Sequence, residues 1–97
     1  GLTNKHIVKG IITLEKPQSD LFTSANNGNE IIYLCKNNIH SEELFKDWIL
    51  YNGWKKADQV GEGYFFINEN EETLLLNRET IVFDRYLLWR ASRLIEN

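Results

Sequence analysis

Hydrophobic and polar residues in the first third of the chain predict two strands joined by a polar loop. Residues 4–15 are rich in β-branched side chains, which favours a strand, and Gly10 within them indicates a bulge or bend. Residues 30–36 form a continuous apolar run, which is typical of a strand buried on both faces. The long polar connection between the two strands is interrupted by Leu21 and Phe22. Long loops of this kind are often functional.

The clearest helix is predicted directly after the second strand. Ser41 is a good N-cap residue, and Glu42 and Glu43 follow it in the first turn, where the helix dipole favours negative charge. Gly53 supplies a C-terminal stop, because glycine readily adopts the left-handed conformation that ends many helices. Apolar residues at helical spacing form one face of this helix: Leu44, Phe45, Trp48, Ile49 and Tyr51.

The second half of the chain predicts further strands. Residues 55–60 and 64–67 are expected to be strands on either side of a glycine-containing turn. The apolar runs 73–76 and 80–83 follow, and they are either the two arms of a tight hairpin or one long bent strand.

A second helix is predicted from Asp84, as its N-cap, to about residue 96. Its apolar face consists of Leu87, Leu88, Ala91, Leu94 and Ile95. The complete order is β-β-α-β-β-β-α, which predicts an α+β fold with an antiparallel sheet of about five strands and two helices. We expect a single small domain over residues 3–97, and we set aside Gly1 and Leu2 as a remnant of cloning or processing.

The predicted strands carry more apolar residues than a sheet covered on one face requires. A half-covered strand usually alternates polar and apolar residues, but residues 31–34, 64–67, 74–76 and 81–83 are apolar throughout. One explanation is that the chain buries both faces of its sheet, with one helix on each. The other is a homodimer or an interface with a partner, because large exposed apolar patches usually mark contact surfaces.

Composition places limits on the function. The chain has 97 residues, a formal net charge of −3 and one cysteine. A lone cysteine excludes an internal disulfide and is consistent with a reducing compartment such as the cytoplasm. The mild acidity gives no general attraction to nucleic acid or to anionic membranes, and no apolar run is long enough to cross a bilayer. We expect a cytoplasmic protein without a cofactor or a metal ion.

Catalytic motifs are not found in the sequence. The glycines of residues 61–63 lack the further signature of a phosphate-binding loop, and paired Cys/His metal spacing is missing. Cys35 lies within an apolar run, where a buried and inert thiol is the usual state. His6 and His40 are the only histidines. We therefore expect a non-catalytic protein, and a small enzyme using Cys35 or His40 is the least favoured alternative.

The candidate binding surface is the outer face of the predicted last helix. Arg85, Trp89 and Arg93 would lie together there at helical spacing, with Arg90 nearby. Tryptophan and arginine are the residues most enriched at interface hot spots. The alternative is that Trp89 is buried and that the arginines pair with neighbouring acids.

Leu21 and Phe22 form a second candidate contact. They would either anchor a partner or pin the polar loop to its own domain.

These observations lead to two hypotheses of function. The first is a protein-binding module, such as a small inhibitor, immunity or accessory protein of bacterial or phage origin, with a protein partner or a second copy of the chain bound at the candidate surface. The second is a nucleic-acid-binding accessory domain that uses the arginines and Trp89, in the manner of proteins that stack and clamp single strands. The acidic net charge disfavours the second hypothesis.

Overall fold

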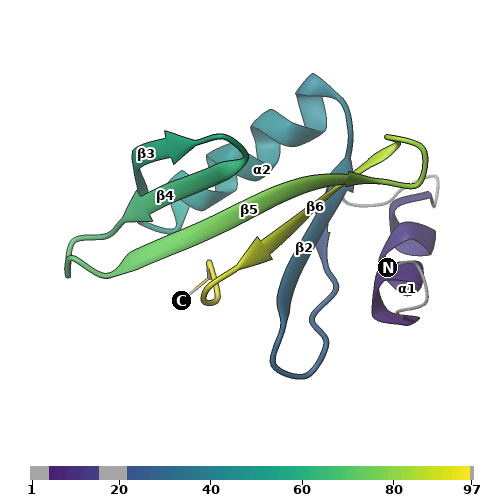
Figure 1. The fold of residues 1–97 in the computed structure, drawn as a ribbon, viewed down its shortest axis with the longest axis horizontal. Helices are drawn as coiled ribbons and strands as arrows, with labels where there is room; N and C mark the ends of the chain where they lie inside the picture. Colours follow the sequence, from purple (N-terminus) through teal and green to yellow (C-terminus); the bar gives the residue numbers. More distant parts are fainter. Residues whose placement is uncertain (1–4, 16–21, 97) are drawn as a thin grey trace.

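The computed structural model describes residues 5–15 and 22–96, which form two helices and a six-stranded antiparallel sheet (Figure 1). The elements in chain order are α1 (Lys5–Glu15), β1 (Phe22–Ser24), β2 (Ile31–Lys36), α2 (Ile39–Tyr51), β3 (Lys55–Val60), β4 (Gly63–Ile67), β5 (Thr73–Ile81) and β6 (Tyr86–Ala91). The predicted α+β class and antiparallel sheet are therefore confirmed. The predicted count of five strands and the predicted order of elements are wrong.

Strands β3 to β6 form an antiparallel meander, and β6 also pairs with β2 on its other side. The spatial order of the sheet is β1-β2-β6-β5-β4-β3, so that β3 to β6 are neighbours in sequence as well as in space. β6 lies between β5 and β2 and pairs with both along its whole length. The strand latest in the sequence is thus one of the central strands of the sheet.

The first element is a helix, not the strand that the β-branched residues predicted. Ile7, Gly10 and Leu14 are the buried residues of α1, and this spacing is that of one helical face. β-Branched residues disfavour helix only slightly, and burial of one face against the sheet outweighs that preference. Gly10 is the point of closest approach, because an added Cβ would lie 2.6 Å from Cδ1 of Leu34 on β2.

The predicted last helix is also wrong, because its first half is strand β6. The apolar residues of β6 point alternately to the two faces of the sheet, and residues 86–89 are all buried. A strand buried on both faces reads as a continuous apolar run, and with Ala91, Leu94 and Ile95 this run happens to match helical spacing. Hydrogen bonds to β2 and β5 decide the conformation of residues 86–91, and a local sequence pattern does not reveal these partners.

The helix predicted after β2 is confirmed as α2, with an earlier start. Its N-cap is Asn38, whose side-chain oxygen accepts a hydrogen bond of 2.8 Å from the backbone N–H of Ser41. Ser41, the predicted cap, is buried within the first turn. At the other end Gly53 has a φ of 92°, the left-handed conformation expected there. Residues 73–81 form one strand, β5, as in one of the two predicted alternatives, but Val82 and Phe83 of the predicted run 80–83 lie beyond its end, in the turn.

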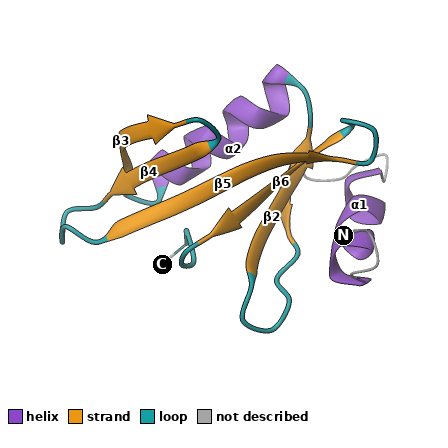
Figure 2. Ribbon diagram, viewed as in Figure 1, coloured by secondary structure: helices purple, strands orange, loops and turns teal. Residues whose placement is uncertain are grey.

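One helix packs on each face of the sheet (Figure 2). Phe45 and Ile49 of α2 belong to the larger core cluster, which includes buried side chains of the four strands β2, β4, β5 and β6. Ile7 and Leu14 of α1 belong to a smaller cluster that covers β2 and β6. The apolar residues on both faces of the central strands are therefore buried largely by the chain itself. Neither cluster includes an outward residue of β3 or β4 on the α1 side.

Candidate functional site

The arginines and the tryptophan of the predicted binding face do not form one surface, because that face assumed a helix. Trp89 is 1% exposed and lies in the core under α2, with its ring centroid 5.1 Å from that of Phe45 and 5.5 Å from that of Tyr64. Trp89 is therefore a packing residue, which was the alternative expectation. Arg90, its neighbour on β6, points to the opposite face of the sheet.

Two of the predicted arginines pair with glutamates. Arg90 forms an ion pair with Glu79 of β5. Nη1 of Arg93 lies 2.8 Å from Oε2 of Glu72. The hydrogen bond that Asn68 donates to Glu72, and then this contact with Arg93, lower the pKa of Glu72. Such exposed pairs contribute little to stability, but they reduce the positive charge available to a phosphate backbone.

The predicted loop contact lies partly outside the described residues. Leu21 is one of the residues that are not described. Phe22 begins β1 and is half-buried, with its ring centroid 5.5 Å from that of Phe45 and 4.9 Å from that of Trp48. Phe22 therefore joins the chain to its own core, as expected in the tether alternative.

Cys35 has the surroundings of a structural thiol. Its side chain is fully buried on β2, and burial raises its pKa to about 11, so the thiol stays protonated at neutral pH. A nucleophilic cysteine requires the opposite shift. Among residues 5–15 and 22–96, no three His, Cys, Asp or Glu side chains are placed to hold a metal ion together.

The turn that joins β5 to β6 has an unusual backbone. Val82, Phe83 and Asp84 follow one another with φ values of 53°, 54° and 61°, in the left-handed region. This region is uncommon for any residue other than glycine and strained for a β-branched one such as Val82. Phe83 lies in this run and is 97% exposed.

Asn37, which follows β2, fixes this turn. Its backbone N–H donates to the carbonyl oxygen of Arg85 at 2.9 Å, and its side-chain Nδ2 donates to that of Asp84 at 2.8 Å. Within the turn, the N–H of Arg85 donates to the carbonyl oxygen of Val82 at 3.1 Å, and the half-buried Val82 packs against the α1-side core. Strained residues persist when their surroundings over-determine them, and this turn meets that condition.

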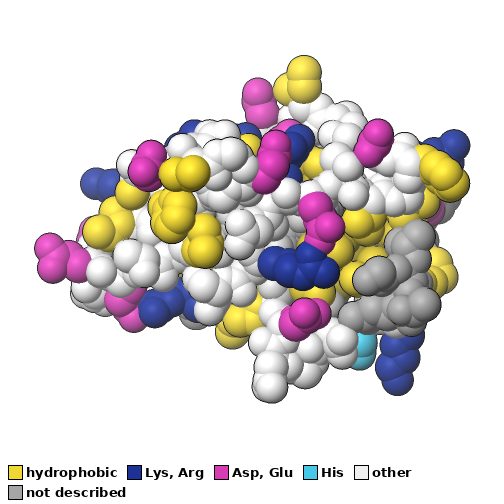
Figure 3. Space-filling model, in the orientation of Figure 1, with side chains coloured by type: hydrophobic (Ala, Val, Ile, Leu, Met, Phe, Trp, Pro, Cys, Tyr) yellow, Lys and Arg dark blue, Asp and Glu magenta, His cyan; other side chains and the backbone are white. Residues whose placement is uncertain are grey.

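A further apolar surface remains on the α1 side of the sheet, over β3, β4 and β5. We call it the open face, and its residues are Val60, Phe65, Ile67 and Leu75. Val60 and Phe65 are exposed, and the other two are partly exposed. Figure 3 shows hydrophobic side chains gathered over β3 and β4 on this side of the molecule.

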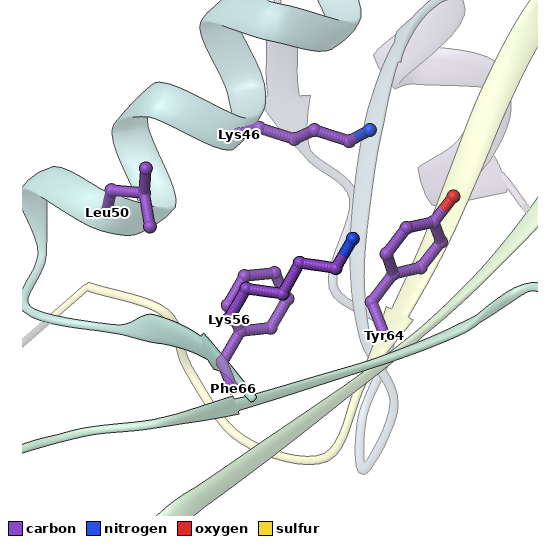
Figure 4. A pocket seen from close by; sticks show the side chains of 5 residues that line it. All are labelled: Lys46, Leu50, Lys56, Tyr64 and Phe66. Carbon is purple, nitrogen blue, oxygen red and sulfur yellow. The ribbon is translucent and has the colours of Figure 1, made fainter. Parts of the chain in front are cut away.

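A pocket of about 140 Å³ lies between α2 and the β3–β4 hairpin (Figure 4). We call it the lysine–tyrosine pocket, and its lining residues are Lys46, Leu50, Lys56, Tyr64 and Phe66. The Nζ atoms of the two lysines lie 5.3 Å and 5.5 Å from the centroid of the Tyr64 ring. The pocket therefore combines two cationic groups with aromatic and aliphatic walls.

The sequence pattern indicated neither the strained turn nor the pocket. Residues 81–83 have the composition of a strand, so Phe83 was assigned to a predicted strand, although the following Asp84 is a common turn residue. Lys46 and Lys56 are separated by the end of α2, and tertiary packing alone brings them over one ring.

Comparison with known proteins gives no relative from which a function could be transferred: no protein-family model matches the chain, and no curated protein or solved structure is significantly similar to it. Within the described part of the chain, neither helix is long and apolar enough to cross a membrane.

Proposed function

We propose that this chain is a non-catalytic protein-binding module that contacts its partner through the β5–β6 turn. The observation that carries the proposal is the nearly complete exposure of Phe83 on a strained and hydrogen-bonded turn. An exposed phenylalanine contributes nothing to the core, whereas aromatic side chains are enriched in the centres of protein interfaces.

The energetics of the turn support a role outside folding. A left-handed conformation costs an L-residue other than glycine about 1–2 kcal/mol, and three residues in succession adopt it here. Glycine at these positions would avoid most of that cost. Strain of this kind is concentrated at binding and catalytic sites, where it holds a side chain ready for contact.

The surroundings of Phe83 suit a protein partner. Arg85 is exposed in the same turn, and arginine is a frequent hot-spot residue. Ile39, at the start of α2, is 77% exposed and follows shortly after Asn37, the residue that holds the turn. A small acidic domain with this surface fits an inhibitor, immunity or accessory protein of bacterial or phage origin, and the partner is either another protein or a second copy of the chain.

The nucleic-acid alternative has less support. Arg78, Arg90 and Arg93 each pair with at least one glutamate, and Trp89 is buried, so it offers no ring to a base. Single-strand binding needs exposed aromatic rings beside a positively charged groove.

The test is affinity capture from a lysate of the source cell, followed by measurement of Kd for the captured protein. Phe83→Ala is expected to weaken binding at least about 30-fold, as for a hot-spot residue. Tyr51→Ala is the matched control, because Tyr51 is also an aromatic residue with most of its surface exposed, 87%, but lies at the end of α2. Light scattering of the purified chain tests self-association in the same variants. Equal binding by the wild type and Phe83→Ala, with both folded, would refute the proposal.

A further inference from the structure

The lysine–tyrosine pocket has the features of a ligand site that is separate from the β5–β6 turn. Lys46 and Lys56 come from α2 and β3, and Figure 4 shows both ammonium groups on the same side of the Tyr64 ring. Two like charges in one pocket repel each other, and an anion placed between them would convert that repulsion into two attractions. The one hydrogen bond described for Nζ of Lys56 goes to the neutral Oε1 of Gln59 at 2.8 Å.

The carboxylates near the pocket neutralise its cations incompletely. Oε2 of Glu42 lies 3.4 Å from Nζ of Lys46, but the same oxygen lies 3.1 Å from Nε of Arg78. Arg78 also pairs with Glu62 at 2.9 Å. Together with Lys56, the cluster holds three cations and two carboxylates, so one positive charge remains in a chain whose net charge is negative.

The rest of the pocket is apolar. Phe66 is buried and forms a wall, and Leu50 is about half exposed at the side of α2. A volume of about 140 Å³ is close to that of a cavity that takes up benzene and well below the usual 300–1,000 Å³ of drug-sized sites. The pocket therefore admits a molecule of fewer than about ten heavy atoms. An apolar wall disfavours a strongly hydrated anion such as inorganic phosphate, because that anion would lose its water without replacement.

We propose that this pocket binds a small monocarboxylate whose carboxyl group is attached to a short apolar chain. The carboxylate lies between Lys46 and Lys56, and the chain lies against Leu50 and Phe66. Charge-assisted hydrogen bonds from the two ammonium groups give the site its preference for an acid over an alcohol of the same length. Because few atoms are buried, the affinity is in the millimolar range.

The experiment is a titration of the isotope-labelled chain with hexanoate, followed by amide chemical shifts. The expected result is saturable shifts centred on α2 and the β3–β4 hairpin, with much smaller effects from hexanol and from inorganic phosphate at the same pH and ionic strength. Hexanol that binds as tightly as hexanoate, or phosphate that competes with it, would overturn the proposal, as would shifts that do not saturate.

Variants of the lysines locate the carboxylate. Lys46→Gln and Lys56→Gln are each expected to weaken hexanoate binding about tenfold, the usual effect of losing a hydrogen bond to a charged group. Lys55→Gln is the matched control, since Lys55 precedes Lys56 on β3 and pairs with Ile67, on the opposite face of the sheet. Urea denaturation of all three variants shows whether each remains folded. Equal weakening by Lys55→Gln would mean that the anion responds to net charge alone, and the pocket assignment would fail.

Discussion

Gly10 is the position at which α1 comes closest to the sheet, and replacing it with alanine tests that contact. In an isolated helix Gly→Ala would stabilise by about 1 kcal/mol. Here the new Cβ would lie 2.6 Å from Cδ1 of Leu34, about 1 Å closer than carbon atoms normally approach. Leu34 is fully buried and cannot rotate into solvent. Ala25 and Thr23 lie 3.5 Å from the same Cβ, an ordinary contact that adds no strain.

The two effects on the free energy of unfolding oppose each other. Overpacking of a buried contact costs about 1–3 kcal/mol, which exceeds the gain in helix propensity. We therefore expect Gly10→Ala to destabilise the protein by about 1 kcal/mol. In a Leu34→Val background, which lacks the offending Cδ1, the same substitution should stabilise by about 1 kcal/mol. The coupling between the two positions is then about 2 kcal/mol.

Urea denaturation followed by tryptophan fluorescence measures all four members of this double-mutant cycle. Lys9→Gly is the control for the helix, because Lys9 is exposed in α1 and the change should cost about 1 kcal/mol through propensity alone. If Gly10→Ala stabilises the protein equally in both backgrounds, the close packing of α1 on β2 is refuted.

Three further predictions concern the C-terminal segment, Tyr33 of β2 and the β5–β6 turn. Ile95 is fully buried and Leu94 is about half exposed, so Ile95→Ala should lower the free energy of unfolding by about 2–5 kcal/mol and Leu94→Ala by well under 1 kcal/mol, as urea denaturation can show. Burial raises the pKa of Tyr33 above the usual value of about 10, so the unfolded state loses this proton first and stability should fall as the pH rises above about 10. Denaturation at a series of pH values should show a shallower fall for Tyr33→Phe, and identical slopes would contradict the burial of the hydroxyl. Phe83→Gly should leave the free energy of unfolding unchanged or raise it, while weakening partner binding at least as much as Phe83→Ala does; a decrease of more than about 1 kcal/mol in urea denaturation would show that the turn is not strained.

Tertiary context explains which sequence predictions succeeded. α2 was predictable because its caps and its apolar face are local signals, and even there the cap was assigned to Ser41 instead of Asn38. The segment of α1 was predicted as a strand and the segment of β6 as a helix, because both segments are apolar on more than one side. Ile7 and Leu14 show helical spacing amid β-branched residues, whereas β6 is decided by hydrogen bonds to β2 and β5.

The candidate site was less predictable than the fold. Arg85, Trp89 and Arg93 were grouped by helical spacing, and residues 84–96 do not form a helix. Arg85 is nevertheless exposed, in the β5–β6 turn. The exposure of Phe83 depends on backbone angles that no local pattern indicated. The lysine–tyrosine pocket depends on the packing of α2 against the β3–β4 hairpin, which brings together residues without any sequence motif.

The central position of β6 has a consequence for how the protein is made. During synthesis β2 leaves the ribosome long before β6. In the finished sheet, however, the edge of β2 that faces away from β1 pairs with β6. Until about residue 91 has emerged, the strands form two separate pieces, the β1–β2 pair and the β3–β4–β5 meander. Each piece has a strand edge without hydrogen-bond partners and exposed apolar side chains. Unpaired strand edges of this kind promote aggregation. Nascent chains that stall before β6 should therefore depend on chaperones, and the sheet is completed in one late step.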